Sequence, residues 1–517
     1  MKTEKGNSIN NELFRTPVRV INLGIQDFAN DLRKQSVPVS EVDWHPPAGG
    51  NTELVELLKK VYGAPKELSA ATDDGGATQA LVDRIERANQ EAIDRIVRSQ
   101  PKVVDVAPAA DAVELPPYTI LHAGPPIGWD RMCGPQKRAV LGAIQFEGWA
   151  SDGPSAETMI ESGKVTLDPT HKFGVVAPMT GIVSPSMPVL VVRNETFGNY
   201  GFSTFNEGRG NVLWFGVYDE GTLERLRWIR DTLSYAVKAT IQKTGPIDVF
   251  DVDAQGLQMG DECHARSAAC TNILIKSLAL GMIEADLNSD VIASVIRFMA
   301  DNSHFFLNFT MAAAKATMDA AHGIPYSTVV TAISRNGVDC MIRVSGLGEN
   351  WLVAPVTKMN EALYYTGFSV SDAAGDIGDS AIIETCGLGG MAIPAAPSMA
   401  VFVGGSLSDE IAAVRDLRQI TVATHPKFTL PTMGFEQTPL GIDVRRVVET
   451  RVVPFITTGV LHETSSTTGQ IGTGVAHIPI EVFDQALVAL AREWNLSLSS
   501  SQQSIPVSAI KLGAGAE

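Results

Sequence analysis

Residues 268–282 form a run in which apolar side chains fall on nearly every face of a helix. A helix of this kind is stable only when most of its surface is covered, so the chain must build a core around it. Residues 260–266 come directly before the run and combine two carboxylates, a thiol, an imidazole and a guanidinium. We therefore predict a buried helix that Asp261 caps and that carries its polar groups at the N-terminal end.

The start of such a helix suits an anion, because its free N–H groups and its dipole both present positive charge. His264 and Arg266 then lie close to a bound oxyanion, with Glu262 beside them. In the alternative interpretation, Asp261 only caps the helix, and His264 and Arg266 pair with carboxylates of the protein. The motif alone does not decide between the two.

The composition limits the classes of partner. The formal net charge is −17 over 517 residues and no basic run occurs, so neither nucleic acid nor an anionic membrane has electrostatic support as a partner. No signal segment and no run of about eighteen uncharged apolar residues is found, which predicts a protein without a membrane span. The cysteines are scattered and odd in number, which fits a reducing cytoplasm: Cys133, Cys263, Cys270, Cys340 and Cys386.

The N-terminal part has the pattern of an α/β fold. Residues 18–42 read as a strand, a turn at Gly24, a helix and a second strand, which is a βαβ unit of Rossmann-like type. A dinucleotide fingerprint would need three glycines where Gly24 stands alone, so we predict the topology and not NAD binding. Residues 78–99 are predicted to form an amphipathic helix, and the proline- and alanine-rich stretch 107–117 a linker.

The expected fold class is therefore α/β and α+β with several domains. A Rossmann-like domain covers 1–115, and the mixed α+β body contains an inserted helical domain. Within the body we predict helix over 219–243, 261–323 and 480–494, a hairpin turn at 334–337, and strands at 249–252, 444–448 and 452–456. The domains after the first are an α+β part (116–258), the helical domain (259–328), a glycine-rich α+β part (329–496) and a disordered tail (497–517).

Two further polar regions carry candidate binding residues. Residues 206–211 place Asn206, Glu207 and Arg209 among glycines that let the backbone approach a ligand closely. Residues 375–390 are rich in glycine, and their N–H groups can form a nest for phosphate or carboxylate, with Asp379 or Glu384 as a base or cation ligand. The substrate- or phosphate-binding candidates in the glycine-rich segments are Gly378, Ser380, Gly389, Gly390 and Gly472.

A fold that gathers these regions would form an anion pocket for carbamoyl or acyl transfer from a phosphate. Arg209 and Arg266 would hold the anions and His264 would polarise a carbonyl or shuttle a proton. Cys263 ranks as a buried cysteine before it ranks as a nucleophile. No cofactor is predicted; a divalent cation on Asp261, Glu262 and Asp379 stays an alternative without diagnostic spacing. His304 and His322 are interpreted as core or cap histidines.

Six motifs, in order, resemble those of the YlbE/YahG-like family. They are DWHPPAGG at 43–50, HAGPP at 122–126, SPSMP at 184–188, MGDECHAR at 259–266, DIGDS at 376–380 and QIGTG at 470–474. The resemblance runs from about residue 18 to about residue 492. Each motif is weak by itself, and the ordered set is specific.

The resemblance implies a cytoplasmic subunit of an oxamate carbamoyltransferase of the AllG type, which acts in anaerobic allantoin breakdown. The implied reaction interconverts oxalurate plus phosphate with oxamate plus carbamoyl phosphate. The implied partners are an FdrA-type chain that resembles CoA-ligase subunits and a third small subunit. The Ser-x-Arg-Thr-Arg phosphate motif of ordinary transcarbamylases is missing from this sequence, so their catalytic scheme does not transfer.

Two other functions stay open at this point. The chain would also suit an acyl-CoA or acyl-phosphate ligase-type component that acts on another ureido or amide acid. It would equally suit a non-catalytic scaffold subunit whose glycine loops dock partner chains.

Overall fold

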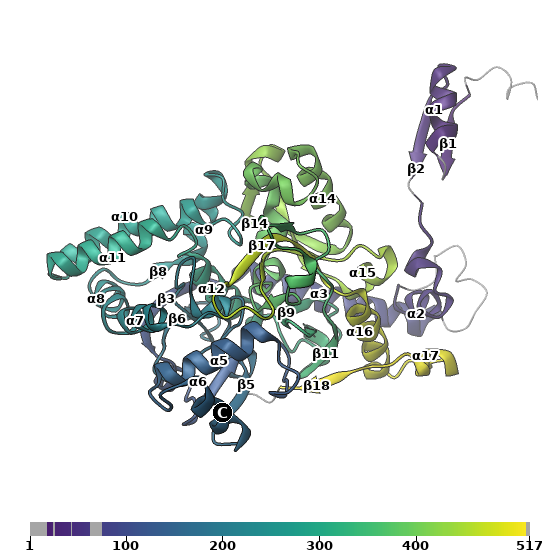
Figure 1. Ribbon diagram of the computed structural model, residues 1–517. Coiled ribbons are helices and arrows are strands. Elements are labelled where there is room, and N and C mark those ends of the chain that lie inside the picture. The colour runs from purple at the N-terminus through teal and green to yellow at the C-terminus, as the bar shows by residue number, and fades with distance from the viewer. Residues whose placement is uncertain (1–17, 24–25, 43, 63–74, 513–517) are drawn as a thin grey trace, which may run out of the picture.

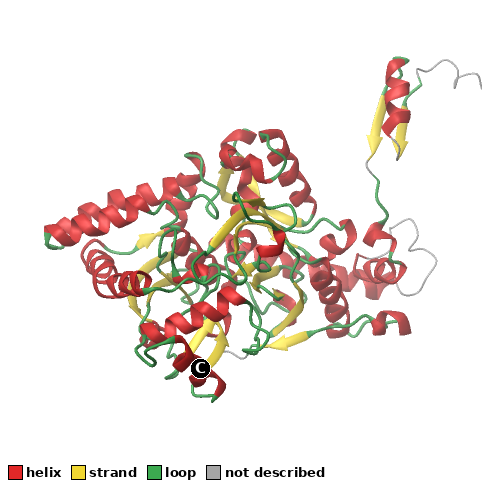
Figure 2. Ribbon diagram, viewed as in Figure 1, coloured by secondary structure: helices red, strands yellow, loops and turns green. Residues whose placement is uncertain are grey.

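The structure is a computed structural model that describes residues 18–23, 26–42, 44–62 and 75–512. Gly24, Asp43 and residues 513–517 of the predicted tail lie outside the described residues. Most of the described chain forms one body of small sheets covered by helices, as Figures 1 and 2 show. A short N-terminal unit stands away from this body.

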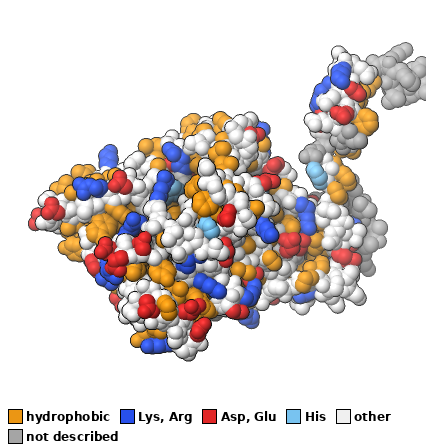
Figure 3. Space-filling model, in the orientation of Figure 1, with side chains coloured by type: hydrophobic (Ala, Val, Ile, Leu, Met, Phe, Trp, Pro, Cys, Tyr) orange, Lys and Arg blue, Asp and Glu red, His pale blue; other side chains and the backbone are white. Residues whose placement is uncertain are grey.

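The N-terminal unit consists of β1 (Val20–Leu23), α1 (Gln26–Lys34) and β2 (Val39–Val42), and its two strands pair in parallel. The predicted βαβ unit is thus confirmed. The larger Rossmann-like domain predicted over 1–115 is not seen in the described part of the chain, because β3 (Pro101–Pro108) does not join β1 and β2. It pairs in a different, antiparallel sheet. Within the described residues β1 and β2 therefore have no third strand, and Figure 3 shows apolar side chains on the surface of this unit.

One sheet of the body is four-stranded and antiparallel, in the order β7-β6-β3-β8. Its other strands are β6 (Pro188–Asn194), β7 (Tyr200–Thr204) and β8 (Ile247–Asp248). Beside it, β4 (Thr119–His122) and β5 (Thr166–Pro169) form a parallel pair. Three helices belong to this part: α4 (Ala109–Ala112) in the predicted linker, α5 (Gly134–Phe146) and α6 (Gly153–Glu161).

Besides α4, this sheet is contacted by α8 (Ser234–Thr244), α9 (Val249–Gln258) and α12 (Leu307–Ala320). The other helices in this part of the chain are α2 (Thr52–Tyr62), α3 (Gly75–Arg98), α7 (Glu220–Trp228), α10 (Ala268–Glu284) and α11 (Ser289–Asp301). The predicted helices over 78–99, 219–243 and 261–323 are confirmed in outline. The strand predicted at 249–252 is wrong, because this segment opens α9. Val249, Val252 and Gly256 are buried at helical spacing, and the Asp248 side chain caps the first turn.

The predicted start of the long apolar helix is corrected by the structure. α10 begins at Ala268 with Ser267 as its N-cap residue, and Asp261 lies in the loop before it. Asp261 still serves the helix, because its Oδ2 accepts the N–H of Cys270 over 2.9 Å. The helix is also less buried than predicted, since Leu280 and Ile283 are exposed on its outer side.

The helical stretch expected as a domain of its own is divided in the structure. α10 and α11 pack on each other and on α8 and project from the body in Figure 1. α12 instead packs against β6 and β7, and its residues 307–318 are all buried. The core of the protein therefore forms around α12.

A five-stranded sheet has the order β13-β9-β10-β11-β18. Its strands are β9 (Val330–Asn336), β10 (Asp339–Val344), β11 (Asn350–Pro355), β13 (Ile377–Gly378) and β18 (Ala509–Lys511). A hairpin forms here as predicted, but its turn lies at Gly337 and Val338 and not at 334–337, because Ser334 and Arg335 lie buried within β9. The tail predicted as disordered is corrected over 500–511, because α17 (Ser500–Ser504) is followed by β18, which pairs with β11.

The remaining strands form a sheet in the order β12-β17-β16 and a β14–β15 pair. They are β12 (Leu363–Tyr364), β14 (Thr421–Leu430), β15 (Glu436–Ile442), β16 (Phe455–Leu461) and β17 (Gln470–His477). The helices here are α13 (Ile382–Thr385), α14 (Leu407–Gln419), α15 (Val444–Thr450) and α16 (Ile480–Glu493). The predicted helix at 480–494 is confirmed. The strand at 452–456 is confirmed only at its end, in β16.

The strand predicted at 444–448 is wrong, because these residues form α15. Val444, Val447 and Val448 are buried with the spacing of one helix face, and the Asp443 side chain accepts the N–H of Arg445 at the first turn. A short run of valines satisfies the strand pattern and the helix pattern equally.

Charged side chains of both signs are mixed over the face drawn in Figure 3. Among the residues that the structure describes, no helix has both the length and the hydropathy that crossing a bilayer requires.

Arg445 provides a test of the packing of α15. It is buried and its Nη2 lies 2.8 Å from Asp443 Oδ2 and 2.9 Å from Glu86 Oε1. Arg445→Met leaves Asp443 buried without its cation, so we expect the free energy of unfolding to fall by about 3–5 kcal/mol. Urea unfolding followed by circular dichroism measures the change. Arg227→Met, which removes an exposed pair with Glu220, should cost less than about 1 kcal/mol, and equal losses would contradict the assignment.

Candidate functional site

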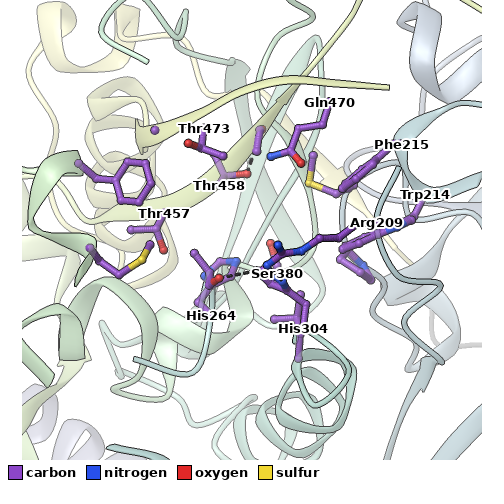
Figure 4. Close-up of a pocket in the computed structure, with 18 of the residues that line it drawn as sticks. Arg209, Trp214, Phe215, His264, His304, Ser380, Thr457, Thr458, Gln470 and Thr473 are labelled. Atoms are coloured by element: carbon purple, nitrogen blue, oxygen red, sulfur yellow. Dashed lines mark hydrogen bonds between the residues drawn. The ribbon is translucent and has the colours of Figure 1, made fainter. Parts of the chain in front are cut away.

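The body contains a cavity of about 320 Å³, here termed the site pocket. It is lined by residues from segments that are far apart in the sequence, and Figure 4 shows most of the lining residues. Its polar lining consists of Arg209, His264, His304, Tyr365, Ser380, Thr457, Thr458, Gln470 and Thr473. Its apolar lining includes Met179, Trp214, Phe215, Leu307, Met399 and Phe402. Within the part of the chain that the structure describes, none of the lining residues is an aspartate or a glutamate.

Strands β16 and β17 supply one wall of the site pocket. Thr457, Thr458, Gln470 and Thr473 lie on this wall in Figure 4, opposite His264, Ser380 and His304. The hydroxyl of Thr457 is buried and has no hydrogen-bond partner among the described residues. It is therefore available to a ligand.

Arg209 is held in the pocket by neutral groups. Its Nη2 donates to Ser303 Oγ over 2.7 Å and to His304 Nδ1 over 3.1 Å, and His304 Nε2 donates to the carbonyl of Ala265. Burial, reinforced by Arg209, lowers the pKa of His304 to about 4, so this imidazole is neutral and accepts from Arg209. No ion pair with a described carboxylate neutralises Arg209. Its charge is therefore free for an anion.

His264 is a second potential cation. Its Nδ1 donates to Glu384 Oε1 over 2.7 Å, which leaves Nε2 as the ring nitrogen for a ligand. Burial lowers the pKa of His264, but the Glu384 carboxylate, helped by Glu262, outweighs burial and raises it above its ordinary value. The imidazolium form is thus favoured in a pocket that lacks acids on its surface.

The glycine nest predicted at 389–390 binds a carboxylate that belongs to the protein itself. The N–H of Gly390 donates to Glu384 Oε1 over 3.1 Å, and the N–H of Gly389 donates to the carbonyl of Glu262 over 2.7 Å. Gly389 has a φ of +60°, and a Cβ there would collide with Glu384 Oε1. These glycines therefore position Glu384 for His264, and neither lines the site pocket.

Glu262 binds the backbone of the loop that carries His264. Its Oε2 accepts the N–H of His264 over 2.7 Å and its Oε1 accepts the N–H of Arg266 over 2.8 Å. Burial raises the pKa of Glu262 to about 7. Arg266 donates from Nε to the Gly260 carbonyl and lies 3.5 Å from Asp261, whose pKa burial raises. Glu262, Arg266 and Asp261 thus hold the loop that carries His264 and do not line the pocket.

Asp379 lies behind Ser380, which does line the pocket. The Asp379 carboxylate is buried and accepts four hydrogen bonds, from Thr170 Oγ1, Ser334 Oγ and the N–H groups of Ala177 and Gly124. Burial raises its pKa, and these donors oppose the rise. Next to it, the carbonyl of Gly378 accepts a hydrogen bond from the buried Arg335. This network fixes the backbone that presents the Ser380 hydroxyl to the site pocket.

The remaining predicted site residues, from 206–211 and 468–474, make contacts within the protein itself. Asn206 Oδ1 accepts the N–H of Gly208, and Glu207 Oε2 accepts the N–H of Leu213 over 2.7 Å. Burial raises the pKa of Glu207 to about 7. Both residues shape the loop that carries Arg209. Gly472 lies in β17 opposite Tyr364 and Val460, where there is little room for a side chain.

Of the predicted site residues, Arg209, His264 and Ser380 thus line one cavity. Sequence reasoning missed the threonines of β16 and β17, because threonine is common in strands for reasons of propensity. It also interpreted His304 as a core or cap histidine, whereas this side chain lines the pocket and accepts a hydrogen bond from Arg209.

The predicted cation ligands are not brought together. Over the described residues, the group of three side chains that meets the distance for a shared metal ion is Asp253, Cys263 and Cys270, and not Asp261, Glu262 and Asp379. Cys263 is fully buried, and burial raises the pKa of its thiol well above the ordinary value. The structure therefore gives no support to Cys263 as a thiolate nucleophile.

Gly389→Ala tests how Glu384 is positioned. Gly389 and Gly405 both have positive φ, so an alanine at either position carries a similar backbone cost of about 1–2 kcal/mol. Only Gly389→Ala also pushes on Glu384, since a Cβ at Gly405 meets no described atom within 4 Å. We expect Gly389→Ala to lower the unfolding temperature by several degrees more than Gly405→Ala. Equal shifts in differential scanning fluorimetry would show that Glu384 does not need this contact.

Residues 165–380 match the family model described as "Oxamate carbamoyltransferase subunit AllG". The chain is 43% identical over 416 residues to the oxamate carbamoyltransferase subunit AllG of Escherichia coli (strain K12), which covers 80% of this chain and 99% of that protein. It is 38% identical over 485 residues to the uncharacterized protein YahG of the same strain, covering 94% of this chain and 99% of YahG.

A solved structure is also similar. It is the crystal structure of a conserved protein of unknown function from Enterococcus faecalis V583, with a TM-score of 0.78 and 38% sequence identity, covering 80% of this chain and 99% of that chain. These identities extend over nearly the full length of each relative. The chain therefore belongs to the YahG/AllG family, as the ordered motifs of its sequence predict.

Proposed function

We propose that this chain is a carbamoyltransferase subunit that interconverts oxalurate plus phosphate with oxamate plus carbamoyl phosphate. The observation that supports it best is the charge of the site pocket. Arg209 and His264 provide positive charge in this cavity, and no aspartate or glutamate is found among the described residues that line it. The whole chain, by contrast, has a formal net charge of −17. All the substrates and products of this reaction are anions, and such a pocket is suited to them.

The cavity has a suitable size and chemistry for small anions. Its volume of about 320 Å³ is at the lower end of small-molecule sites, which run from about 300 to 1,000 Å³. Arg209 would bind the carboxylate or phosphate, and the hydroxyls of Ser380 and Thr457 would bind carbonyl oxygens of the ureido acid. Trp214 and Phe215 would exclude water from the reacting carbonyl.

The carbamoyl carbon is attacked by a phosphate oxygen in the oxalurate direction. The new C–O bond forms, the C–N bond to the oxamate part breaks, and its electron pair stays on the leaving nitrogen. That nitrogen takes up a proton, which the Nε2–H of the His264 imidazolium would donate. In the reverse direction the same group accepts the proton from the attacking amide.

Glu384, Glu262, Arg266 and Asp379 are positioning residues in this proposal. Glu384 orients His264 and favours its charged form, and Glu262 holds the backbone of the same loop through two N–H groups. Asp379 fixes the segment that presents Ser380. No step of the proposal uses a metal ion or an organic cofactor.

The relative AllG is named as a subunit, so we propose that this chain also works in a complex. The partners we propose are an FdrA-type chain and a third small subunit. Turnover is therefore tested with this chain alone and co-expressed with those partners, by following carbamoyl phosphate formation from oxalurate and phosphate. An assembled complex that binds oxalurate but makes no carbamoyl phosphate would refute this reaction and favour a ligase-type or scaffold role.

Arg209 gives the first test of the pocket. In the active complex, Arg209→Met should lower kcat/KM for oxalurate by about 100-fold or more, because the charged contact of the pocket to the anion is lost. Arg227→Met removes an arginine from an exposed pair with Glu220 and is the matched control, with kcat/KM close to wild type. Equal rates for Arg209→Met and Arg227→Met, with both complexes intact, would remove Arg209 from the site.

The pH profile gives a second test, specific to His264. The raised pKa means that the imidazolium is present at low pH and lost as the pH rises through that pKa, so kcat/KM should fall on the alkaline side. Glu384→Gln removes the charge that raises the pKa, and the alkaline limb should then move to lower pH. Glu220→Gln, at an exposed carboxylate, should keep the wild-type profile. An unshifted limb in Glu384→Gln would show that His264 is not the titrating group.

A further inference from the structure

A second cavity, of about 720 Å³, shares no lining residue with the site pocket. Its wall combines the segments 112–116 and 171–174, part of α12, and residues of β10 and β11, and Leu512 closes one side. The volume lies in the upper part of the range for small-molecule sites. Neither the proposed reaction nor the motifs of the sequence use this cavity.

Buried charges lie on its wall. Lys315 and Arg343 are 1% and 7% exposed, and both contact Asp319, at 2.8 Å from Lys315 Nζ and 2.6 Å from Arg343 Nη2. Burial alone would raise the pKa of Asp319, but the two cations outweigh it and lower that pKa, so Asp319 is ionised. Two buried cations therefore share one carboxylate. Asp319 therefore cannot balance both charges by itself, and Asp379 is a further carboxylate that acts on Lys315.

His171 is a second, independent sign of a missing ligand. Its side chain is fully buried and lines the cavity, yet neither ring nitrogen has a hydrogen-bond partner among the described residues. The nearest carboxylate oxygen, Asp379 Oδ1, is 3.8 Å from its Nε2. Buried polar atoms are normally paired, so these nitrogens point to a partner that binds in the cavity.

Most of the remaining lining is aromatic or apolar, and Lys172, which also lines the cavity, is paired with Asp168. Trp351 packs against the His171 ring at a centroid distance of 5.0 Å and lies under the Arg343 guanidinium, and Phe173 and Phe202 add further aromatic surface. An inorganic anion would leave this surface and most of the volume unused. The exposed side chains of Glu114 and Glu349 also belong to the lining, and they disfavour a polyanion.

We propose that this cavity is a binding site for an organic monophosphate that carries an apolar or aromatic body. Lys315 and Arg343 bind the phosphate, His171 donates or accepts at its remaining oxygens, and Trp351 and the phenylalanines contact the body. The site is separate from the site pocket, but Asp379 connects them. It faces His171 on one side, and its neighbour Ser380 lines the site pocket on the other.

Isothermal titration of the full-length chain with phenyl phosphate tests the proposal. Phenyl phosphate should bind at least tenfold more tightly than inorganic phosphate, because only the organic phosphate also covers the aromatic wall. Phenol, which lacks the phosphate, should bind at least tenfold more weakly than phenyl phosphate. Equal affinity of inorganic and phenyl phosphate, or binding of benzoate as tight as that of phenyl phosphate, would overturn the assignment.

His171→Phe locates the ligand. This substitution keeps a ring of similar size and removes two unpaired nitrogens, so the unfolding temperature should stay the same or rise. The Kd of phenyl phosphate should rise at least tenfold. A wild-type Kd in a folded His171→Phe variant would overturn the proposal, since a purely structural histidine would not affect the ligand.

Arg227→Met, which removes an arginine from an exposed pair with Glu220, is the matched control, and its Kd for phenyl phosphate should equal that of the wild type. Arg209→Met removes a cation from the site pocket and so distinguishes binding there from binding in the second cavity. If Arg209→Met loses the ligand and His171→Phe keeps it, the phosphate occupies the site pocket and the proposal fails. As a further variant, Arg343→Lys keeps the positive charge beside Asp319 and shortens the reach to the phosphate, and it should raise the Kd at least threefold.

Discussion

The buried carboxylate of Asp379 is the junction on which the arrangement of both cavities depends. Its four donors come from segments that are far apart in the sequence: Thr170, Ala177, Gly124 and Ser334. A buried carboxylate is costly unless donors surround it, so the fold that satisfies Asp379 must bring all of these segments to one point. Ser380 is thereby fixed toward the site pocket, and His171 lies on the opposite side of the same carboxylate.

The fold could be predicted where a pattern is long and local. The helix near 78–99 and the hairpin at Gly337 have such patterns, and both are confirmed. Runs of a few valines were misleading at 249–252 and 444–448, because four or five residues cannot separate strand from helix and the deciding contacts are tertiary. The pairing of β18 with β11 could not be predicted for a similar reason. A polar tail becomes ordered only through contact with a sheet edge that is distant in the sequence.

The site could be predicted in its residue types and only partly in its geometry. Arg209, His264 and Ser380 come together as expected, since unusual polar residues beside glycines have few structural roles. The glycine-rich segment 375–390 is predicted to form a nest for phosphate or carboxylate, but in the structure the N–H of Gly390 donates to Glu384 of the same chain. Nothing local distinguishes a nest that serves a ligand from one that serves the protein.

The wall of the second cavity is built from parts that are synthesised at very different times. β10 and β11 supply Arg343 and Trp351, whereas Leu512 follows β18 much later in the chain. During translation, the sheet edge beside Trp351 therefore stays open until β18 leaves the ribosome and pairs with β11. A ligand that requires the closed cavity binds only molecules whose C-terminal strand has docked. Such a ligand would stabilise the chains in which β18 has paired with β11 and would not stabilise the others.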